Sequence, residues 1–129
     1  MPKPTVARPT DAELAILRVL WERGPSTVRE VHEALPPGRR VGYTTILKLL
    51  QIMTDKRLVC RDETARAHVY EAGAPRAETE GQLVGDLLER AFGGSAERLV
   101  MRALSSKKAS SAELARIRQL LDEIEGGHR

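Results

Sequence analysis

The chain has 129 residues, of which 41% are hydrophobic and 30% are charged, and its formal net charge is +3. This composition is that of an ordinary globular protein with one medium domain or two small ones. No apolar run approaches the roughly 18–20 residues that span a bilayer, and the opening MPKPTVARPT has no signal-peptide pattern, so we expect a cytoplasmic protein without a membrane partner.

Cysteine and histidine usage excludes several kinds of chemistry. The single cysteine, Cys60, cannot form an intramolecular disulfide, and as a strand residue it is expected to be a small buried side chain. His32, His68 and His128 lack paired metal-ligand spacing. No serine or cysteine has a recognisable base partner, and no glycine-rich phosphate loop is present. We therefore expect no catalytic residues, no metal and no cofactor.

The positive charge is unevenly distributed. Residues 1–73 contain twelve Lys/Arg against nine Asp/Glu, whereas residues 74–129 contain nine of each. An excess of this size points only weakly to a polyanionic partner, because it is often just a solvated face.

Residues 1–9 contain three prolines and no apolar period, which predicts a flexible arm. A helix is predicted over residues 11–23, since Thr10 and Glu13 have capping-box spacing and Gly24-Pro25 ends the segment. Its predicted apolar face consists of Leu14, Leu17, Leu20 and Trp21.

A second helix of about ten residues is predicted next. Ser26 or Thr27 would cap it, and Pro36 would stop it. Its buried face would contain Val28, Val31 and Leu35.

The stretch GYTTILKLLQIM, residues 42–53, predicts a third helix with Ile46, Leu49, Leu50 and Met53 facing inward. The runs LVCRD and AHVYE then predict a two-stranded hairpin around ETAR. Three helices followed by a hairpin are the element order of a winged helix-turn-helix, here residues 10–73.

Residues 74–129 predict three more helices, separated at Gly93-Gly94 and before the capping box Ser110/Glu113. About 55 residues lie near the lower limit for independent stability, so we expect the apolar faces to close against a second copy of the chain. The expected dimerisation residues are Leu83, Leu87, Leu88, Phe92, Leu99, Val100, Leu104, Leu114, Ile117, Leu121 and Ile124. The predicted fold is thus mostly α with a small β-hairpin: an N-terminal winged helix-turn-helix plus a C-terminal three-helix dimerisation domain.

Three phrases, GYTTILKLLQIMTDKRLV, RAHVYEA and FGGSAERLVMRAL, together resemble the penicillinase-repressor (BlaI/MecI) family of bacterial transcription regulators. The resemblance covers about residues 10–125. It implies a homodimeric repressor that binds double-stranded DNA at a dyad operator in a promoter and controls β-lactam resistance or cell-envelope stress genes.

Two positions depart from the family pattern. In typical members a membrane sensor protease cleaves an Asn-Phe pair, whereas the matching positions here are Arg102-Ala103. A sensor protease would thus be a partner only if it accepted that pair. Arg57 replaces a glycine that is usual in the family, which predicts strain if the backbone there is left-handed. The C-terminal cysteine cluster of copper-sensing relatives is missing.

The helix-turn-helix assignment selects candidate DNA contacts. Tyr43, Thr44 and Thr45 begin the third helix, and Lys48 and Gln51 share its outer face with Thr44, so these residues would contact bases or phosphates. The alternative is that a threonine only caps the helix and that Lys48 and Gln51 form a solvated face.

Leu47 would contact a thymine methyl or pack against the second helix, and the sequence favours neither reading. Arg39 and Arg40 would contact the DNA backbone or stay in solvent.

Arg61 and Arg66 flank the wing turn, from which arginines contact phosphate or the minor groove; the alternative is hairpin solubility. Ser26, Thr27 and Arg29 begin the second helix, where phosphate contact and helix capping are both expected.

Two other classes of function remain open on the sequence. One is a winged helix used as a protein-interaction module, and the other is a one-component regulator that binds a small molecule between its domains. The salt dependence of nucleic-acid binding would separate the first from a repressor, and a pocket would mark the second.

Overall fold

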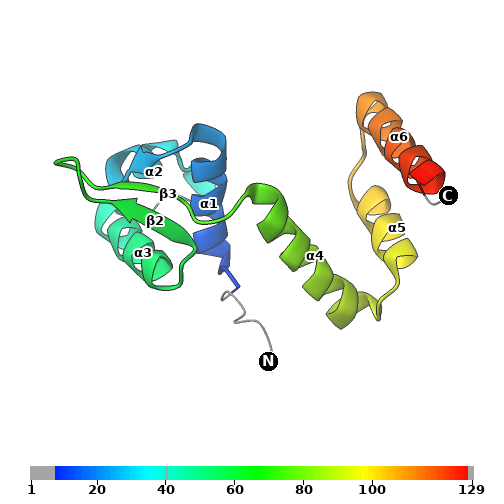
Figure 1. Ribbon diagram of the computed structural model, residues 1–129, viewed down its shortest axis with the longest axis horizontal. Coiled ribbons are helices and arrows are strands. Elements are labelled where there is room, and N and C mark those ends of the chain that lie inside the picture. The colour runs from blue at the N-terminus through cyan, green and yellow to red at the C-terminus, as the bar shows by residue number, and fades with distance from the viewer. Residues whose placement is uncertain (1–7, 40, 128–129) are drawn as a thin grey trace. The chain divides into compact units, whose positions relative to one another are not determined.

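A computed structural model describes residues 8–39 and 41–127 of the chain (Figure 1). The elements, in chain order, are α1 (Asp11–Arg23), β1 (Ser26–Thr27), α2 (Val28–Ala34), the 3₁₀ turn η1 (Pro37–Arg39), α3 (Tyr43–Asp55), β2 (Val59–Asp62), β3 (Val69–Ala72), α4 (Arg76–Phe92), α5 (Ala96–Ser106) and α6 (Ser111–Gly127). The chain divides into two compact units, one ending at Leu83 and one starting at Val84. The predicted class, mostly α with a small β-hairpin, is confirmed.

Capping boxes begin the first two helices as the sequence predicts. In α1 the Glu13 N–H donates to Thr10 Oγ1 at 3.2 Å, and the Thr10 N–H donates back to Glu13 Oε1 at 2.9 Å. In α2 Thr27, not Ser26, is the N-cap. This helix has seven residues instead of about ten, because Leu35 already takes an extended backbone before Pro36.

The sheet contains one strand more than the predicted hairpin. Strands β2 and β3 form the expected antiparallel hairpin, and β1 pairs with the other edge of β3, giving the order β1-β3-β2. Ser26 lies opposite Tyr70, and Thr27 lies opposite Val69. Two residues are too few to show the alternation by which a strand is recognised in a sequence.

The core of the first unit lies between α1, α2, α3 and the sheet. Its buried apolar residues are Ile16, Leu17, Val19, Leu20, Val28, Val31, Leu35, Ile46, Leu50, Met53, Leu58, Val59 and Tyr70. The inward faces predicted for α2 and α3 are confirmed, apart from Leu49, which is only partly buried. In α1 the buried face includes Leu17 and Leu20 as predicted, but its other apolar residues are Ile16 and Val19, whereas Leu14 and Trp21 are only partly buried.

One ion pair in this unit joins α1 to the C-terminal end of α3. Glu13 is only 2% exposed, and Lys56 Nζ lies 2.9 Å from Glu13 Oε2 and 3.1 Å from Oε1. Burial alone would raise the pKa of the Glu13 carboxyl, but the hydrogen bond from the Thr10 N–H and the contacts of Lys56 outweigh it and hold the pKa below its usual value.

A left-handed residue, Arg57, follows the C-cap of helix α3. The Arg57 N–H donates to the Thr54 carbonyl and the Leu58 N–H to the Met53 carbonyl, which is the Schellman arrangement. Arg57 has a φ of 65°, so the left-handed backbone that the sequence suggested is present.

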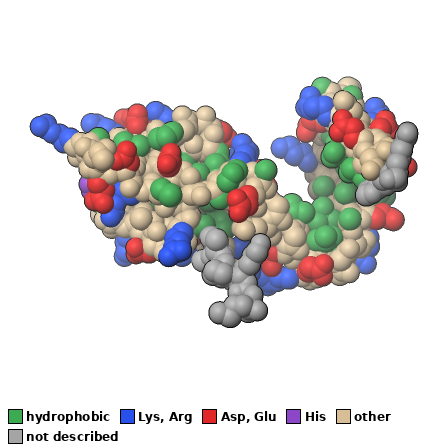
Figure 2. Space-filling model, viewed as in Figure 1, with side chains coloured by type: hydrophobic (Ala, Val, Ile, Leu, Met, Phe, Trp, Pro, Cys, Tyr) green, Lys and Arg blue, Asp and Glu red, His purple; other side chains and the backbone are tan. Residues whose placement is uncertain are grey.

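The second unit consists of the rest of α4 together with α5 and α6. Gly93 and Gly94 have φ values of 56° and 84° and separate α4 from α5, and the predicted Ser110/Glu113 capping box begins α6. None of the residues from Val84 to Gly127 is buried. Apolar side chains of these helices lie at the molecular surface (Figure 2); Leu121 is 55% exposed and Leu87 is 49% exposed.

Candidate nucleic-acid interface

The N-terminal end of α3 is open to a ligand. Its N-cap is Gly42, and no side chain caps the helix. Tyr43, Thr44 and Thr45 are therefore the first helical residues, and all three are exposed; Tyr43 is 50% exposed. The reading in which a threonine serves as the N-cap is wrong, so the threonine hydroxyls are not used in capping.

The outer face of α3 carries the predicted polar row. Thr44, Lys48 and Gln51 are exposed, whereas Ile46 and Leu50 on the opposite side are buried. This row is therefore free to meet a partner along two turns of the helix.

A surface groove brings together parts of α2, α3 and the wing. We call it the α2–α3–wing groove, and it is lined by Thr27, Val28, Arg29, Tyr43, Leu47, Arg66, Ala67, His68 and Tyr70. Five of these residues are DNA contacts predicted from the sequence: Thr27, Arg29, Tyr43, Leu47 and Arg66. The lining contains two arginines and no carboxylate, so the groove favours an anionic ligand.

The position of Leu47 is compatible with both arrangements that the sequence left open. It is partly buried and packs against the core, and it also lines the α2–α3–wing groove. Packing against the core does not remove it from a surface where it could meet a thymine methyl.

The hairpin loop of the wing is ordered by side chains. Asp62 Oδ1 accepts hydrogen bonds from the Thr64 N–H at 2.9 Å and the Thr64 hydroxyl at 2.7 Å, and these bonds lower the pKa of Asp62. Glu63 lies between two basic side chains, with Oε2 3.6 Å from Arg61 Nη2 and Oε1 3.8 Å from His68 Nε2. The β2–β3 hairpin extends past the helices at the left of Figure 1.

Arg61 is not among the residues lining the α2–α3–wing groove. Its side chain is 30% exposed, pairs with Glu63 and lines a different groove that also includes Pro25 and Cys60. A phosphate contact by Arg61 would thus have to compete with this ion pair.

Ser26 requires a correction. It is 1% exposed, and its hydroxyl donates to the Gly24 carbonyl at 2.9 Å. A buried side chain used in this way cannot contact DNA, so Ser26 leaves the candidate interface. Thr27 stays in it, although its Oγ1 accepts the Glu30 N–H at 3.2 Å; the hydrogen bond that the Thr27 N–H returns lowers the pKa of Glu30.

Two predicted contacts cannot be placed. Arg40 and the side chain of Arg39 lie outside the described residues. The backbone of Arg39 ends the η1 turn.

Sequence reasoning missed His68 as a member of this surface. The sequence gives this histidine no role beyond the excluded metal site, yet it lines the α2–α3–wing groove together with Arg66. Its place within RAHVYEA, next to the wing turn, was the signal that could have found it. Cys60, expected to be buried, is exposed on β2.

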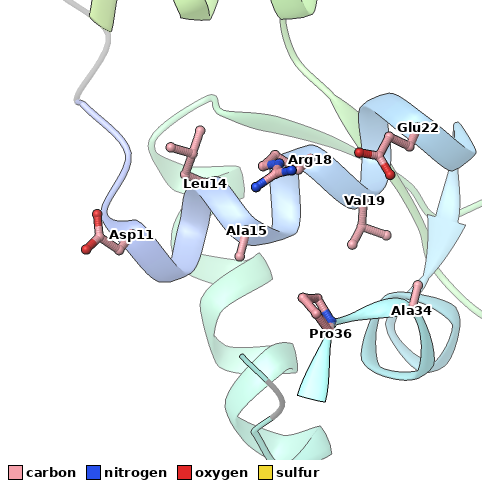
Figure 3. A pocket seen from close by; sticks show the side chains of 8 residues that line it. All are labelled: Asp11, Leu14, Ala15, Arg18, Val19, Glu22, Ala34 and Pro36. Carbon is pink, nitrogen blue, oxygen red and sulfur yellow. The ribbon is translucent and has the colours of Figure 1, made fainter. Parts of the chain in front are cut away.

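A second groove lies on the first unit, along α1 (Figure 3). Its lining residues are Asp11, Leu14, Ala15, Arg18, Val19, Glu22, Ala34 and Pro36. In the part of the chain that the structure describes, no buried polar side-chain atom lacks a hydrogen-bond partner, so no buried polar group there awaits a ligand.

Neither a metal site nor a membrane-spanning helix is found among the described residues. These contain no group of three His, Cys, Asp or Glu side chains placed to hold a metal ion. No described helix is both long enough and apolar enough to cross a bilayer.

Comparison with known proteins supports the same kind of function as the geometry of this surface does. The penicillinase repressor family model matches residues 9–123. The transcriptional regulator BlaI of Mycobacterium tuberculosis is 37% identical over 120 residues, which are 92% of this chain and 86% of that protein. The penicillinase repressor of Bacillus licheniformis is 23% identical over 114 residues, which are 88% and 89% of the two chains.

A solved structure from a study of how 6-hydroxynicotinic acid regulates DNA binding by Bordetella bronchiseptica BpsR aligns with a TM-score of 0.46. It is 17% identical and covers 89% of this chain and 74% of that one. The family match, in contrast, spans residues of both compact units and confirms the resemblance seen in the sequence.

Proposed function

Because this chain belongs to the penicillinase repressor family, whose members are transcriptional repressors and not enzymes, we propose that it represses transcription as a homodimer bound to a dyad operator in promoter DNA. The observation that carries the proposal is the α2–α3–wing groove. It places Arg29 and Arg66 around the exposed start of α3, with no carboxylate in the lining.

The α3 row supplies the sequence-reading part of the proposal. Phosphate contacts from the groove would fix the position of the protein on the duplex, while base contacts would come from the outer face of α3 in the major groove. Lysine can donate to guanine, and glutamine can pair with adenine. Thr44, Lys48 and Gln51 are the exposed side chains that fit this role.

The dimer is supported by the second unit. Large apolar side chains of α4, α5 and α6 are exposed in the single chain, and the helical residues from Val84 to Gly127, none of which is buried, have little to stabilise them alone. We propose that the predicted dimerisation residues cover one another across two copies. Two recognition helices would then meet half-sites about one helical turn apart, or a multiple of it.

For the regulated genes we propose β-lactam resistance or cell-envelope stress genes, with the repressor acting in the cytoplasm, where promoter DNA lies. The support is the name of the Bacillus licheniformis relative, a penicillinase repressor. A sensor protease as partner stays a prediction. Arg102 and Ala103 are exposed on α5 but differ from the family's Asn-Phe pair.

The test is binding of the purified protein to the DNA upstream of its own gene, compared with shuffled DNA, at about 150 mM salt. Specific sites normally bind three or more decades tighter than random DNA, so equal affinity for the two would overturn the proposal. Footprinting should show a protected region with dyad symmetry. Weak binding with little salt dependence would instead favour a protein-interaction module, because phosphate contacts require a steep dependence.

A further inference from the structure

His68 lies where the wing meets the start of α2. It directly precedes β3, whose first residue, Val69, is paired with Thr27 of β1. Its side chain is 45% exposed and lines the α2–α3–wing groove. The side chain is thus accessible, and the residue forms part of the surface that the proposed function assigns to DNA.

Charged and titratable groups reach this position from three elements. Arg29 comes from α2, Tyr43 from α3 and Arg66 from the wing, all as lining residues of the groove. Glu63 is the nearby carboxylate, 3.8 Å from His68 Nε2, and it is shared with Arg61. Glu63 itself does not line the groove, whereas Arg29 lies 3.9 Å from Glu33 Oε2 on the same helix. Protonation of His68 would therefore add one positive charge to a groove whose two arginines include one in an ion pair.

We propose that His68 is a DNA-contacting side chain that binds phosphate in its protonated form, so that DNA affinity increases as pH falls from 8 to 6. The inference rests on the proposed function, because it places phosphates in this groove. Histidine is the side chain whose charge ordinarily changes in this pH interval. A phosphate near the ring favours the charged form, and by linkage the charged form favours bound DNA.

The experiment measures the dissociation constant for a duplex at pH 6 and pH 8 with ionic strength held constant, for the unmodified protein and for His68→Gln. Glutamine keeps a polar side chain of similar length but does not titrate. Uptake of one full proton would change affinity tenfold per pH unit, or about a hundredfold over this interval, and partial uptake should make the unmodified protein bind roughly three- to tenfold tighter at pH 6. His68→Gln should lose most of this difference and bind at pH 6 about as the unmodified protein does at pH 8.

A second readout identifies the phosphate. The slope of log affinity against log salt changes by about 0.9 for each phosphate neutralised on a duplex. The slope of the unmodified protein should therefore be steeper at pH 6 than at pH 8 by up to that amount, while the His68→Gln slope should be the same at both. Since His68 is nearly half exposed, the variant should keep the thermal unfolding midpoint of the unmodified protein.

His32→Gln is the matched control. His32 is partly buried on α2, its ring forms a T-shaped pair with Tyr43 at a centroid distance of 6.3 Å, and it is not among the residues that line the groove. This variant should keep the pH difference. If it loses the difference, or if His68→Gln keeps it, the assignment to His68 is overturned.

The two proposals can fail separately. Phosphate contacts are independent of sequence, so the pH measurement is run on both upstream and shuffled DNA. Equal affinity for the two DNAs would overturn operator recognition while leaving the His68 result valid. Absence of binding to any duplex would overturn both.

Discussion

The two compact units of this chain differ in how they use apolar side chains. The unit ending at Leu83 encloses thirteen buried apolar residues from three helices and a sheet. From Val84 to Gly127 no residue is buried, although the helices there carry apolar residues at helical spacing. Burial of a large aliphatic side chain contributes about 1.5–3 kcal/mol, so only the first unit gains this stabilisation within one chain.

Folding and assembly are therefore divided along the chain. The first unit should fold at any protein concentration, whereas the second needs a partner for its apolar faces. A ligand-binding surface on the first unit is thus supported by a core that does not depend on assembly.

The largest effect is expected in the core of the first unit. Leu50 is fully buried in α3, so Leu50→Ala should lower the free energy of unfolding by about 2–5 kcal/mol. Urea unfolding followed by the fluorescence of Trp21, the only tryptophan, measures it. Ile52→Ala on the same helix should cost much less, because Ile52 is exposed. Equal losses, or a Leu50→Ala loss that depends on protein concentration, would contradict the division.

The next effect concerns the second unit. Leu121→Lys places a charge on the proposed dimer interface, and we expect the dimer dissociation constant to rise about a hundredfold or more. Gln119→Lys introduces the same residue on the opposite side of α6 and should leave the dimer intact. Sedimentation equilibrium measures both. A Leu121→Lys variant that is still dimeric at the same concentration would refute this interface.

Substitutions on the outer face of α3 should change DNA binding, whereas those in the two apolar regions change stability or dimerisation. Lys48→Ala or Gln51→Ala should reduce the difference in binding free energy between operator variants by about 1–3 kcal/mol. Arg66→Ala should instead weaken binding to every DNA sequence, by about the same amount for each. Fluorescence anisotropy with matched and altered duplexes separates the two outcomes. Uniform losses from all three substitutions would show that the assigned roles are wrong.

Low pH should reduce the stability of the first unit partly through protonation of Glu13. Its pKa lies below the usual value in the folded protein, so its ionised form contributes stability above the unfolded-state pKa, and this contribution is lost as pH falls toward the folded-state pKa. Glu13→Gln should remove that component of the loss as the pH falls below the ordinary carboxyl pKa of 4.5. Glu22→Gln, at an exposed position on α1, is the control. Identical acid unfolding curves for Glu13→Gln and the unmodified protein would contradict the role of the Lys56 contact.

The smallest effect is expected at Arg57. Arg57→Gly should be more stable than Arg57→Ala by about 1 kcal/mol, because only glycine adopts the left-handed backbone at this helix end without strain. Both variants lose the same long side chain, so their comparison isolates the backbone. Thermal unfolding of the first unit gives the difference, and a more stable alanine variant would argue against strain at this turn.

Local patterns allowed much of the fold to be predicted. Capping residues such as Thr10 and Ser110 begin helices through contacts three residues away, and the period of Ile46, Leu50 and Met53 gives the buried side of α3. These interactions lie within one element and are therefore visible in a single sequence.

The features that were missed depend on distant parts of the chain. Glu13 is buried because Lys56, 43 residues away, reaches it, and β1 exists because Ser26 lies opposite Tyr70. His68 joins Arg29 only through the pairing of the wing with β1. A surface assembled from α2, α3 and the wing has no signature in the spacing of residues along one segment.

The exposed thiol of Cys60 makes the chain suitable for measuring a distance between two copies. It is the only cysteine, and it lies on β2 within the wing. One nitroxide label attached there would give a single spin per protomer without any other substitution. Pulsed electron paramagnetic resonance would then report the distance between the two wings of a dimer, free and on DNA, as one distribution.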